Sequence, residues 1–412
     1  MPMMIIIIMA ILVIMAIILY TSTTNEHFEQ NIDHNMISQR SDLMRVFEDG
    51  FNRKEFNIPN VMVDGIPHKI LKGDFHMHTI YSDGHLHPYD RVIESWMHGL
   101  DVIAITDHID FFPHKDVKNS DLNTSYDKAL SISKALGMTL IKGGELTKSE
   151  PIGHYNFLFL DDVNSVKGKT WIETLNNAKD QGAVIIWNHP GWAYLKSEKT
   201  PVKNSINKKL LKSGLLDGIE IANCKEYYPE AFSWASDNDL TIFGNSDAHL
   251  HRRYYLDKIP PPMTLVFTRG NDISSIKYAL VNNMTIVHNR GSLFGKEHLL
   301  NSLFNACVEI LDKKIVTNSN NEKKIYVRIL NKSDFKFEFY QLSDDDDIYY
   351  RNNFTLYPRD IKVAMFTFGA NINYDLERDI EIDYEIRNIY IDPNTNLQTK
   401  IKFKWINKIG LN

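Results

Sequence analysis

Between residues 70 and 281 the chain alternates short apolar runs with amphipathic stretches, and this alternation limits the fold more than any other feature. A short apolar run is typical of a buried strand, whereas a longer stretch with a period near 3.6 is typical of a surface helix. Strands that alternate with helices predict a parallel sheet covered by helices, either open or closed into a barrel. The predicted strands are 102–106, 139–142, 155–160, 183–187, 218–222 and 241–243, and the predicted helices are 88–98, 125–136, 169–181, 229–238 and 272–281.

A different pattern begins after residue 305, where apolar and polar residues alternate one by one. This period is typical of antiparallel strands with one face buried and the other exposed to water. We expect an all-β module here, separate from the α/β part. The acidic run Asp344–Asp347 is interpreted as a solvated turn, with a calcium site as the alternative. The predicted strands are 324–330, 335–340, 364–368, 380–384 and 401–405.

The N-terminal segment stands apart from both patterns, because an unbroken apolar run extends from Met3 to Tyr20. A helix needs roughly 17–25 apolar residues to cross a bilayer, so the run is long enough for a membrane anchor. A secretory signal peptide is the other interpretation, although no Lys or Arg precedes the run and no clear cleavage site follows it. We expect residues 1–24 to be a signal peptide or anchor, with an exported or membrane-attached catalytic part. A buried core segment in a cytoplasmic protein is the alternative.

Residues 25–66 are polar and lack a strong period, which indicates a linker or N-terminal extension with a short helix near 41–50. The two cysteines, Cys224 and Cys307, are too few for a disulfide framework and form no Cys-x-x-Cys pair. Any metal must therefore be held by His, Asp and Glu. The formal net charge of −6 does not indicate a nucleic-acid partner, although a local basic patch could still exist.

The residues with the clearest chemistry begin at Gly73-Asp-Phe-His-Met-His-Thr79. If residues 70–78 form a strand, His76 and His78 point to the same face, because side chains two residues apart share a face. Two imidazoles that project together can chelate one metal ion. The turn Ser82-Asp83-Gly84 then returns a carboxylate toward the same place. A lone His-x-His pair is weak evidence, so the interpretation depends on further ligands.

Further His and acidic residues follow the downstream ends of other apolar runs, where parallel α/β folds collect their catalytic groups. After the run 102–106, alternation directs His108 to the face of His76. It directs Asp107 to the opposite face, where a supporting structural role is expected. Unpaired His and acidic side chains are costly to bury, and shared coordination to cations removes that cost. The other residues of this kind are Glu145, His154, His189, Asp247 and His249.

Together these motifs resemble the polymerase and histidinol phosphatase (PHP) superfamily of metal-dependent phosphoesterases. The resemblance covers roughly residues 70–290, with the motifs in the family's order. It implies a distorted, TIM-like (β/α)7 barrel at residues 67–305 with two or three divalent metal ions. The β-rich module predicted from the alternation then occupies residues 306–412. The motifs are His76-x-His78-Thr79, Ser82-Asp83-Gly84, the segment from Gly99 to His108, Glu145, His189-Pro190 and Ser246-Asp-Ala-His249.

Carried over residue by residue, the resemblance implies three metal sites. His154 has a competitor in His114, because the spacing of this ligand from Glu145 varies in the family. A ligand set of nitrogen and oxygen atoms favours zinc, manganese or iron over calcium. The first site comprises His76, His78, Glu145 and Asp247, the second Asp83, His108 and a bridging Glu145, and the third His154, His189 and His249.

The implied reaction is hydrolysis of a phosphomonoester or phosphodiester by a metal-activated water. Arg252 and Arg253 could hold a phosphate bidentately, with a surface ion pair as the alternative. Lys148 and Lys225 are further candidates for substrate contacts. The implied catalytic residues are Asp83, His108, Glu145 and Arg252.

Other polar and aromatic residues near these motifs have structural interpretations beside functional ones. Trp192 and Tyr227 could line the mouth of the site or pack against neighbours. His85 and His87 are assigned to the turn after Asp83, and His98 to a helix end, rather than to a metal.

A metal-dependent amidohydrolase, which also uses His-x-His on a barrel strand, is the alternative enzyme class. Asp83 in a Ser-Asp-Gly turn and the Thr106-Asp-His108 strand end argue against it. An inactive barrel that binds a carbohydrate or a protein is the alternative outside enzymes. The expected partner is a small phosphorylated substrate, which the resemblance does not identify further.

Overall fold

The computed structural model describes residues 52–114, 117, 121–192, 204–250, 261–317, 323–342, 353–367 and 378–405. The predicted signal or anchor at 1–24, most of the predicted linker, the run Asp344–Asp347, and both Arg252 and Arg253 lie outside these residues. Among the helices that are described, none combines the length and the apolar character needed to cross a bilayer.

Up to residue 307 the chain alternates strands and helices. All six predicted strands and five predicted helices form, with one or both ends shifted in every case except α9. The elements β1, β8, β10–β12, α8 and α12 were not predicted. The strands are β1 (Val61–Val63), β2 (Ile66–Asp74), β3 (Val102–Ile105), β4 (Thr139–Lys148), β5 (Gly153–Leu158), β6 (Val184–Trp187), β7 (Gly218–Asn223), β8 (Glu226–Tyr227), β9 (Thr241–Asn245), β10 (Met263–Thr268), β11 (Thr285–Asn289) and β12 (Ser292–Gly295). The helices are α4 (Pro88–Met97), α5 (Thr124–Ala135), η1 (Asn164–Val166), α6 (Trp171–Asp180), α8 (Ser205–Ser213), α9 (Pro229–Asn238), α11 (Ile273–Val281) and α12 (Glu297–Cys307).

Local sequence explains where several helices begin. Pro88 and Pro229 occupy the first turn of α4 and α9, where a residue without an N–H loses no hydrogen bond. The side chains of Thr170 and Asp272 cap α6 and α11, each accepting a hydrogen bond from a backbone N–H of the first turn. These caps fix the points at which the chain leaves a strand and turns back over the sheet.

The strands of this first part form a mixed sheet rather than the purely parallel one that the alternation predicts. β2, β3 and β4 are parallel neighbours, and so are β6, β7 and β9. β5 runs antiparallel between β4 and β6, and β10 runs antiparallel beside β2. The connection from β4 to β5 is too short for a crossover helix, so these two strands can only pair as an antiparallel hairpin.

The segment that carries the first histidine pair lies beyond its strand. β2 ends at Asp74, whereas the sequence predicted a strand through residue 78. Met77 nevertheless pairs with Ala248 in an isolated parallel bridge, which holds the two segments together. His76 and His78 are both fully buried, and their ring centroids are 5.2 Å apart. The expected convergence of the two imidazoles is therefore present without the expected strand.

The strand that carries the central carboxylate is longer than predicted. β4 continues to Lys148 because its second half pairs with β5, with Glu145 opposite Asn156. Glu145 is therefore inside a strand, not beyond its end. An isolated parallel bridge also joins Glu145 to His108, which brings the downstream end of β3 to the same place.

From residue 308 on, the described chain is all β. Alternate residues of β14 and β15 are buried, as the one-by-one alternation predicts. β13, β14 and β17 form a three-stranded antiparallel sheet, and β15, β16, β18 and β19 are joined by antiparallel pairs. The strands are β13 (Val308–Thr317), β14 (Lys323–Asn331), β15 (Phe337–Gln341), β16 (Phe354–Leu356), β17 (Ile361–Thr367), β18 (Arg378–Asp392) and β19 (Thr395–Trp405).

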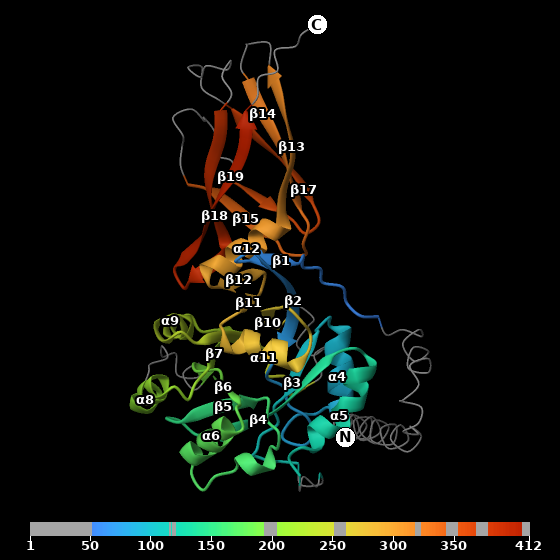
Figure 1. Ribbon diagram of the computed structural model, residues 1–412, viewed down its shortest axis with the longest axis vertical. Helices are drawn as coiled ribbons and strands as arrows, with labels where there is room; N and C mark the ends of the chain where they lie inside the picture. Colours follow the sequence, from blue (N-terminus) through green and yellow to red (C-terminus); the bar gives the residue numbers. More distant parts are fainter. Residues whose placement is uncertain are drawn as a thin grey trace, which may run out of the picture.

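The two parts meet at α12 and β1, with the β-rich part in the upper half of Figure 1 and the α/β part below. β18 pairs in parallel with β12, so one sheet extends from the first part into the second. Leu299 and Leu303 of α12 belong to the same buried apolar cluster as Phe337 and Ile386 of the β-rich part. The expected module is present, but it shares a sheet and a core with the α/β part.

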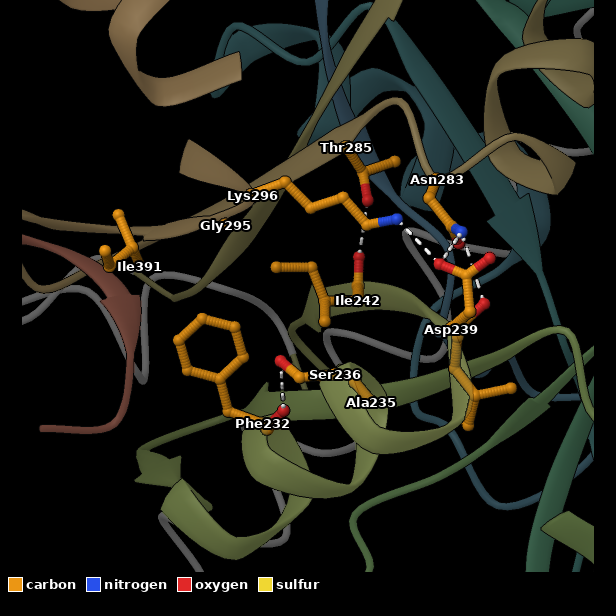
Figure 2. A pocket seen from close by; sticks show the side chains of 11 residues that line it. Phe232, Ala235, Ser236, Asp239, Ile242, Asn283, Thr285, Gly295, Lys296 and Ile391 are labelled. Carbon is orange, nitrogen blue, oxygen red and sulfur yellow. Dashed lines mark hydrogen bonds and ion pairs between the residues drawn. The ribbon is translucent and has the colours of Figure 1, made fainter. Parts of the chain in front are cut away.

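A hollow of about 220 Å³ lies near this junction, between α9, β9, β12 and the end of β18 (Figure 2). Its charged groups are Asp239 and Lys296, which form an ion pair of 2.7 Å, and Asn283 donates to the same carboxylate. The remaining lining is mostly apolar, including Phe232 and Ile391. The described lining offers no group suited to metal binding beyond this paired Asp239.

Candidate metal centre

A cleft of about 550 Å³ opens where the downstream ends of several strands meet. The predicted ligands come to it from separate elements: Glu145 from β4, His154 from β5, and the others from the segments after β2, β3, β6 and β9. The structure thus brings together all nine predicted metal ligands. Those lining the cleft itself are Asp83, His108, Glu145, His154, His189, Asp247 and His249, while His76 and His78 lie buried beneath them.

Four buried atoms at the floor of the cleft form no well-aligned hydrogen bond among the described residues: His76 Nε2, His78 Nε2, Glu145 Oε2 and Asp247 Oδ1. Glu145 Oε2 nevertheless lies 2.8 Å from His108 Nδ1. Asp247 Oδ1 is 3.2 Å from both His76 Nε2 and His78 Nε2. Glu145 Oε2 is 3.4 Å from His78 Nε2. A tetrahedral metal with ligand distances of roughly 2.0–2.1 Å separates its ligand atoms by roughly 3.3–3.4 Å. The identity and spacing of these atoms therefore fit a divalent cation.

A second group forms around Asp83. Its Oδ2 atom is 3.3 Å from His108 Nε2 and 3.2 Å from His249 Nε2. The ring of His78 stacks on that of His249 at 4.2 Å and joins this group to the first. These four residues have ligand atoms within 4.8 Å of one another.

A third group forms around the other oxygen of Glu145. Glu145 Oε1 is 3.2 Å from His154 Nδ1 and 3.8 Å from His189 Nε2, and the two imidazole rings are 4.9 Å apart. The predicted grouping of His249 with these two histidines stays a prediction, while the closest carboxylate contact of His249 among the described residues is with Asp83 at 3.2 Å. His249 lies beside Asp83, because Asp83 reaches it from the turn after β2, while Glu145 faces His154 and His189.

The turn that carries Asp83 is built by Asp107, which accepts hydrogen bonds from Thr79 N at 2.6 Å, Thr79 Oγ1 at 2.6 Å and Ser82 Oγ at 2.7 Å. This is the supporting role expected of the face opposite His108. A Cβ atom at Gly84 would lie 2.5 Å from the carbonyl carbon of His78. Only glycine therefore allows the turn to approach the His78 backbone closely enough to present Asp83.

The carboxylate of Glu220 orients the His76 ring at the floor of the cleft, and Glu220 was not among the predicted site residues. Glu220 of β7 is fully buried, and its Oε1 accepts from His76 Nδ1 at 2.9 Å. Its Oε2 accepts from the backbone N–H of His189 at 2.7 Å. The first contact directs His76 Nε2 at the cleft, as metal-binding histidines usually require. The signal was present in the sequence, because Glu220 is a charged residue inside an otherwise apolar strand.

Backbone strain marks two of the ligand positions. His189 and Asp247 have positive φ angles of 25° and 51°, which non-glycine residues rarely adopt. The hydrogen bond from His189 N to Glu220 holds the first, and a hydrogen bond of 3.0 Å from Asp247 N to the carbonyl oxygen of His76 holds the second. Such strain commonly occurs at functional sites.

A buried arginine also supports the ligands and was not predicted. Arg91 of α4 is fully buried and pairs with Glu94 at 2.6 Å. Its guanidinium also donates to the backbone carbonyls of His78 and His249, both at 3.2 Å. Arg91 therefore ties together two ligand segments that are far apart in the sequence. On an amphipathic helix it resembles an ordinary surface residue, so its role could not be predicted.

Electrostatics keep the carboxylates ionised and two histidines neutral. Burial opposes the charge on Glu145, but His108 and His76 hold its pKa well below the usual range. Burial lowers the pKa of His78 to about 4, and it also lowers the pKa of His189. Neutral imidazole is the form that can coordinate a metal. In contrast, although burial opposes its charge, Glu145 and Asp83 raise the pKa of His108 to about 10.

The predicted substrate residues are only partly described. Lys148 lines the cleft but forms an ion pair with Asp110. Lys225 is exposed, and the aromatic ring of Tyr227 packs on Phe294 at 4.7 Å instead of lining the cleft. Trp192 does line the cleft.

The other histidines have structural positions. His114 Nε2 contacts the carbonyl oxygen of Gly84 at 3.0 Å, and His154, not His114, faces Glu145. His87 and His98 flank the two ends of α4, and His85 follows the Asp83 turn.

Comparison with known proteins agrees with this geometry. The profile of a family described as an Ig-like domain matches residues 308–402. A crystal structure of a two-domain protein from Bacteroides vulgatus, containing a predicted PHP-like metal-dependent phosphoesterase, is 33% identical with a TM-score of 0.78. The match covers 85% of this chain and 99% of that one. No curated protein sequence matches.

Two further solved structures align over a smaller part of this chain. A proposed metal-dependent phosphoesterase from Bifidobacterium adolescentis is 18% identical, covering 43% of this chain and 87% of that one, with a TM-score of 0.34. An amidohydrolase from Chromobacterium violaceum, with bound sulfate and no metal, is 14% identical with the same coverage and a TM-score of 0.32. The extent and identity of the Bacteroides vulgatus match, together with the converging ligands, place the chain among the PHP-like metal-dependent phosphoesterases, and it belongs to that family.

Proposed function

We propose that the cleft hydrolyses a phosphate ester with two or three divalent cations held by its nine histidine and carboxylate ligands. One observation carries this proposal: four buried ligand atoms, His76 Nε2, His78 Nε2, Glu145 Oε2 and Asp247 Oδ1, face one another at ion-pair distances without a well-aligned hydrogen bond. Leaving such groups unpaired inside a protein is costly, and a bound cation would satisfy all four.

The distances support a revised assignment of three ligand sets. His76, His78, Glu145 and Asp247 would hold one cation. Asp83, His108 and His249 would hold a second, and Glu145, His154 and His189 a third. Mixed nitrogen and oxygen ligands support zinc, manganese or iron. Divalent cations in such a site supply a nucleophilic water at neutral pH and neutralise charge on the phosphoryl oxygens.

Side chains of the protein would hold the metal ligands in position. Glu145 would bridge the sets through its two oxygens, Glu220 would fix the ring of His76, and Asp107 would hold the turn of Asp83. The preorganised arrangement supports catalysis because little reorganisation is needed during the reaction. Arg252 and Arg253 follow His249 in the sequence, and we propose them, with Lys148, as phosphate contacts.

We further propose that β2 to β7, β9 and β10 close into a distorted barrel, with β10 between β9 and β2. Thr264 of β10 exchanges two side-chain hydrogen bonds of 3.0 Å with Gly244 of β9, which supports closure at that seam. A single apolar cluster also draws members from β2, β3, β4, β5, β6, β9 and β10. The division into a catalytic part at 67–305 and a β-rich part at 306–412 remains a proposal. We also propose an exported or membrane-anchored location, with residues 1–24 as signal peptide or anchor. The proposed substrate is a small phosphorylated molecule.

The test is metal analysis of the purified full-length chain combined with a panel of phosphomonoesters and phosphodiesters. We expect two or three transition-metal ions per chain and release of phosphate. His76→Ala should reduce both bound metal and turnover, the latter by about 10³-fold or more. Normal turnover in that variant would contradict the proposal, and so would release of ammonia or a carboxylate from amide substrates in place of phosphate release.

A further inference from the structure

Two large aromatic side chains are exposed in the cleft. Phe111 is 48% exposed and Trp192 is 51% exposed. Within the described part of the chain, Phe111 is the only strongly exposed phenylalanine and Trp192 the only strongly exposed tryptophan, and both line the metal cleft. An isolated exposed apolar residue is ordinary, but two at one concave site indicate a contact surface.

Each aromatic ring stands beside a different ligand group. The ring of Phe111 is 5.6 Å from that of His108, which belongs to the Asp83 group. The ring of Trp192 is 6.0 Å from the rings of both His154 and His189, which belong to the other group. A phosphoryl group held by the cations would therefore place its ester substituent next to aromatic faces.

The charge of the cleft limits what that substituent can be. Among the described lining residues, Lys148 is the only Lys or Arg, and it is paired with Asp110. Glu150 adds a further carboxylate to the same wall. Since Arg252 and Arg253 are proposed to contact the phosphoryl group, a second anionic group on the substrate would meet the carboxylates of the described lining, so an uncharged substituent is favoured.

We infer that the cleft selects phosphate esters whose leaving group is an uncharged planar aromatic ring, which Phe111 and Trp192 contact. The inference rests on the proposed function for the phosphoryl position. Aromatic rings prefer offset or edge-to-face contacts at centroid separations of roughly 4.5–7 Å. A saturated ring of similar size buries comparable apolar area but lacks this interaction, and the difference provides a test.

The test compares benzyl phosphate with cyclohexylmethyl phosphate, whose leaving groups are both uncharged primary alcohols. For the metal-loaded full-length chain we expect kcat/KM to favour the benzyl ester by about five- to tenfold. Trp192→Leu and Phe111→Leu should each bring this ratio toward one. Tyr278→Leu, which removes an exposed aromatic ring of α11 away from the cleft, should keep the ratio of the wild type. Equal kcat/KM for the two esters in the wild type would overturn the inference.

Binding of two non-hydrolysable analogues separates this inference from the proposed function. Calorimetry with benzylphosphonate and cyclohexylmethylphosphonate should show the same preference, lost in Trp192→Leu. Preferential binding of benzylphosphonate without hydrolysis of any ester would support the ring contact while contradicting the proposed function. Hydrolysis of both esters without a ring preference in kcat/KM or in binding would leave the function intact and overturn the ring contact.

Discussion

The α/β part and the β-rich part differ in the burial of their ionisable side chains. The first buries His76, Arg91, Glu145 and Glu220 almost completely. From residue 308 on, the buried polar side chains that the structure describes are only Asn, Ser, Gln and Thr. Ion pairs there, such as Arg328 with Asp312, are about half exposed. Buried charges are costly and need partners, so their concentration in one part marks the region where the chain does chemistry.

The largest effect on stability is expected when one member of a buried ion pair is removed. Arg91→Met breaks the buried ion pair with Glu94, and we expect the free energy of unfolding to fall by about 3–5 kcal/mol. Metal affinity should fall as well, because the His78 and His249 carbonyls lose their shared donor. Denaturant unfolding and metal titration measure the two effects.

The double variant Arg91→Met with Glu94→Met separates the two roles. It leaves no unpaired charge, so we expect much of the stability to return. Metal affinity should stay low, because the tie between the ligand segments is still missing. Full recovery of metal affinity would contradict a positioning role for Arg91.

A smaller effect is expected at Glu220. Glu220→Gln keeps the size and one acceptor oxygen but weakens the orientation of His76. We expect metal affinity to fall by about 10–100-fold, as is typical when a partner of a metal-binding histidine is changed. Competition with a chromophoric chelator would measure this. Unchanged affinity would show that burial alone orients His76.

The junction between the two parts supplies a pH prediction. His288 packs against Phe56 and Phe335, and burial lowers its pKa to about 4 from an ordinary value of 6.5. Since the unfolded chain binds this proton first, the stabilising effect is complete above pH 6.5 and is lost as the pH falls toward 4. His288→Leu should weaken the loss of stability between pH 7.5 and pH 5.

The measurement for His288 is urea unfolding at several pH values, with a chelator present in all samples so that metal release does not contribute. The quantity of interest is the difference between the wild type and His288→Leu at each pH. If both proteins lose the same stability on acidification, His288 does not control the junction.

The smallest effect is expected in the β-rich part. Arg328→Ala removes an ion pair exposed to solvent, and such pairs contribute little because water screens them. We expect no measurable shift in the thermal unfolding midpoint and unchanged metal binding. A clear loss of stability would mean that the two parts do not differ as proposed.

Much of the site was predictable because its residues follow apolar runs. Alternation along 102–108 correctly placed His108 in the site and Asp107 behind it. The contact of His249 with Asp83 was not predictable in this way, since it depends on how the turn after β2 folds back. Arg91 was missed because an arginine on an amphipathic helix is ordinarily exposed, whereas Glu220 could have been found from its position inside an apolar strand.

Long-range strand pairing was the other limit. The direction of β5 follows from a short connection and could have been predicted from the sequence. The pairing of β18 with β12 could not have been predicted, because it joins residues that are about a hundred positions apart along the chain. The hydrogen bond between Asn388 and Gly291 beside this pair spans 97 residues. Local periodicity carries no information about such partners.

The strand pair between β12 and β18 has a consequence for biosynthesis. When β12 leaves the ribosome its backbone edge, with Leu293 and Phe294, is uncovered, and its partner Ile389 has yet to be translated. Translation proceeds at about 5–20 residues per second, so the β12 edge of the nascent chain stays unpaired for roughly 5–20 s and can pair with another chain. A fragment that stops at residue 305 would carry it permanently, so we expect such a fragment to aggregate even where its active cleft is intact.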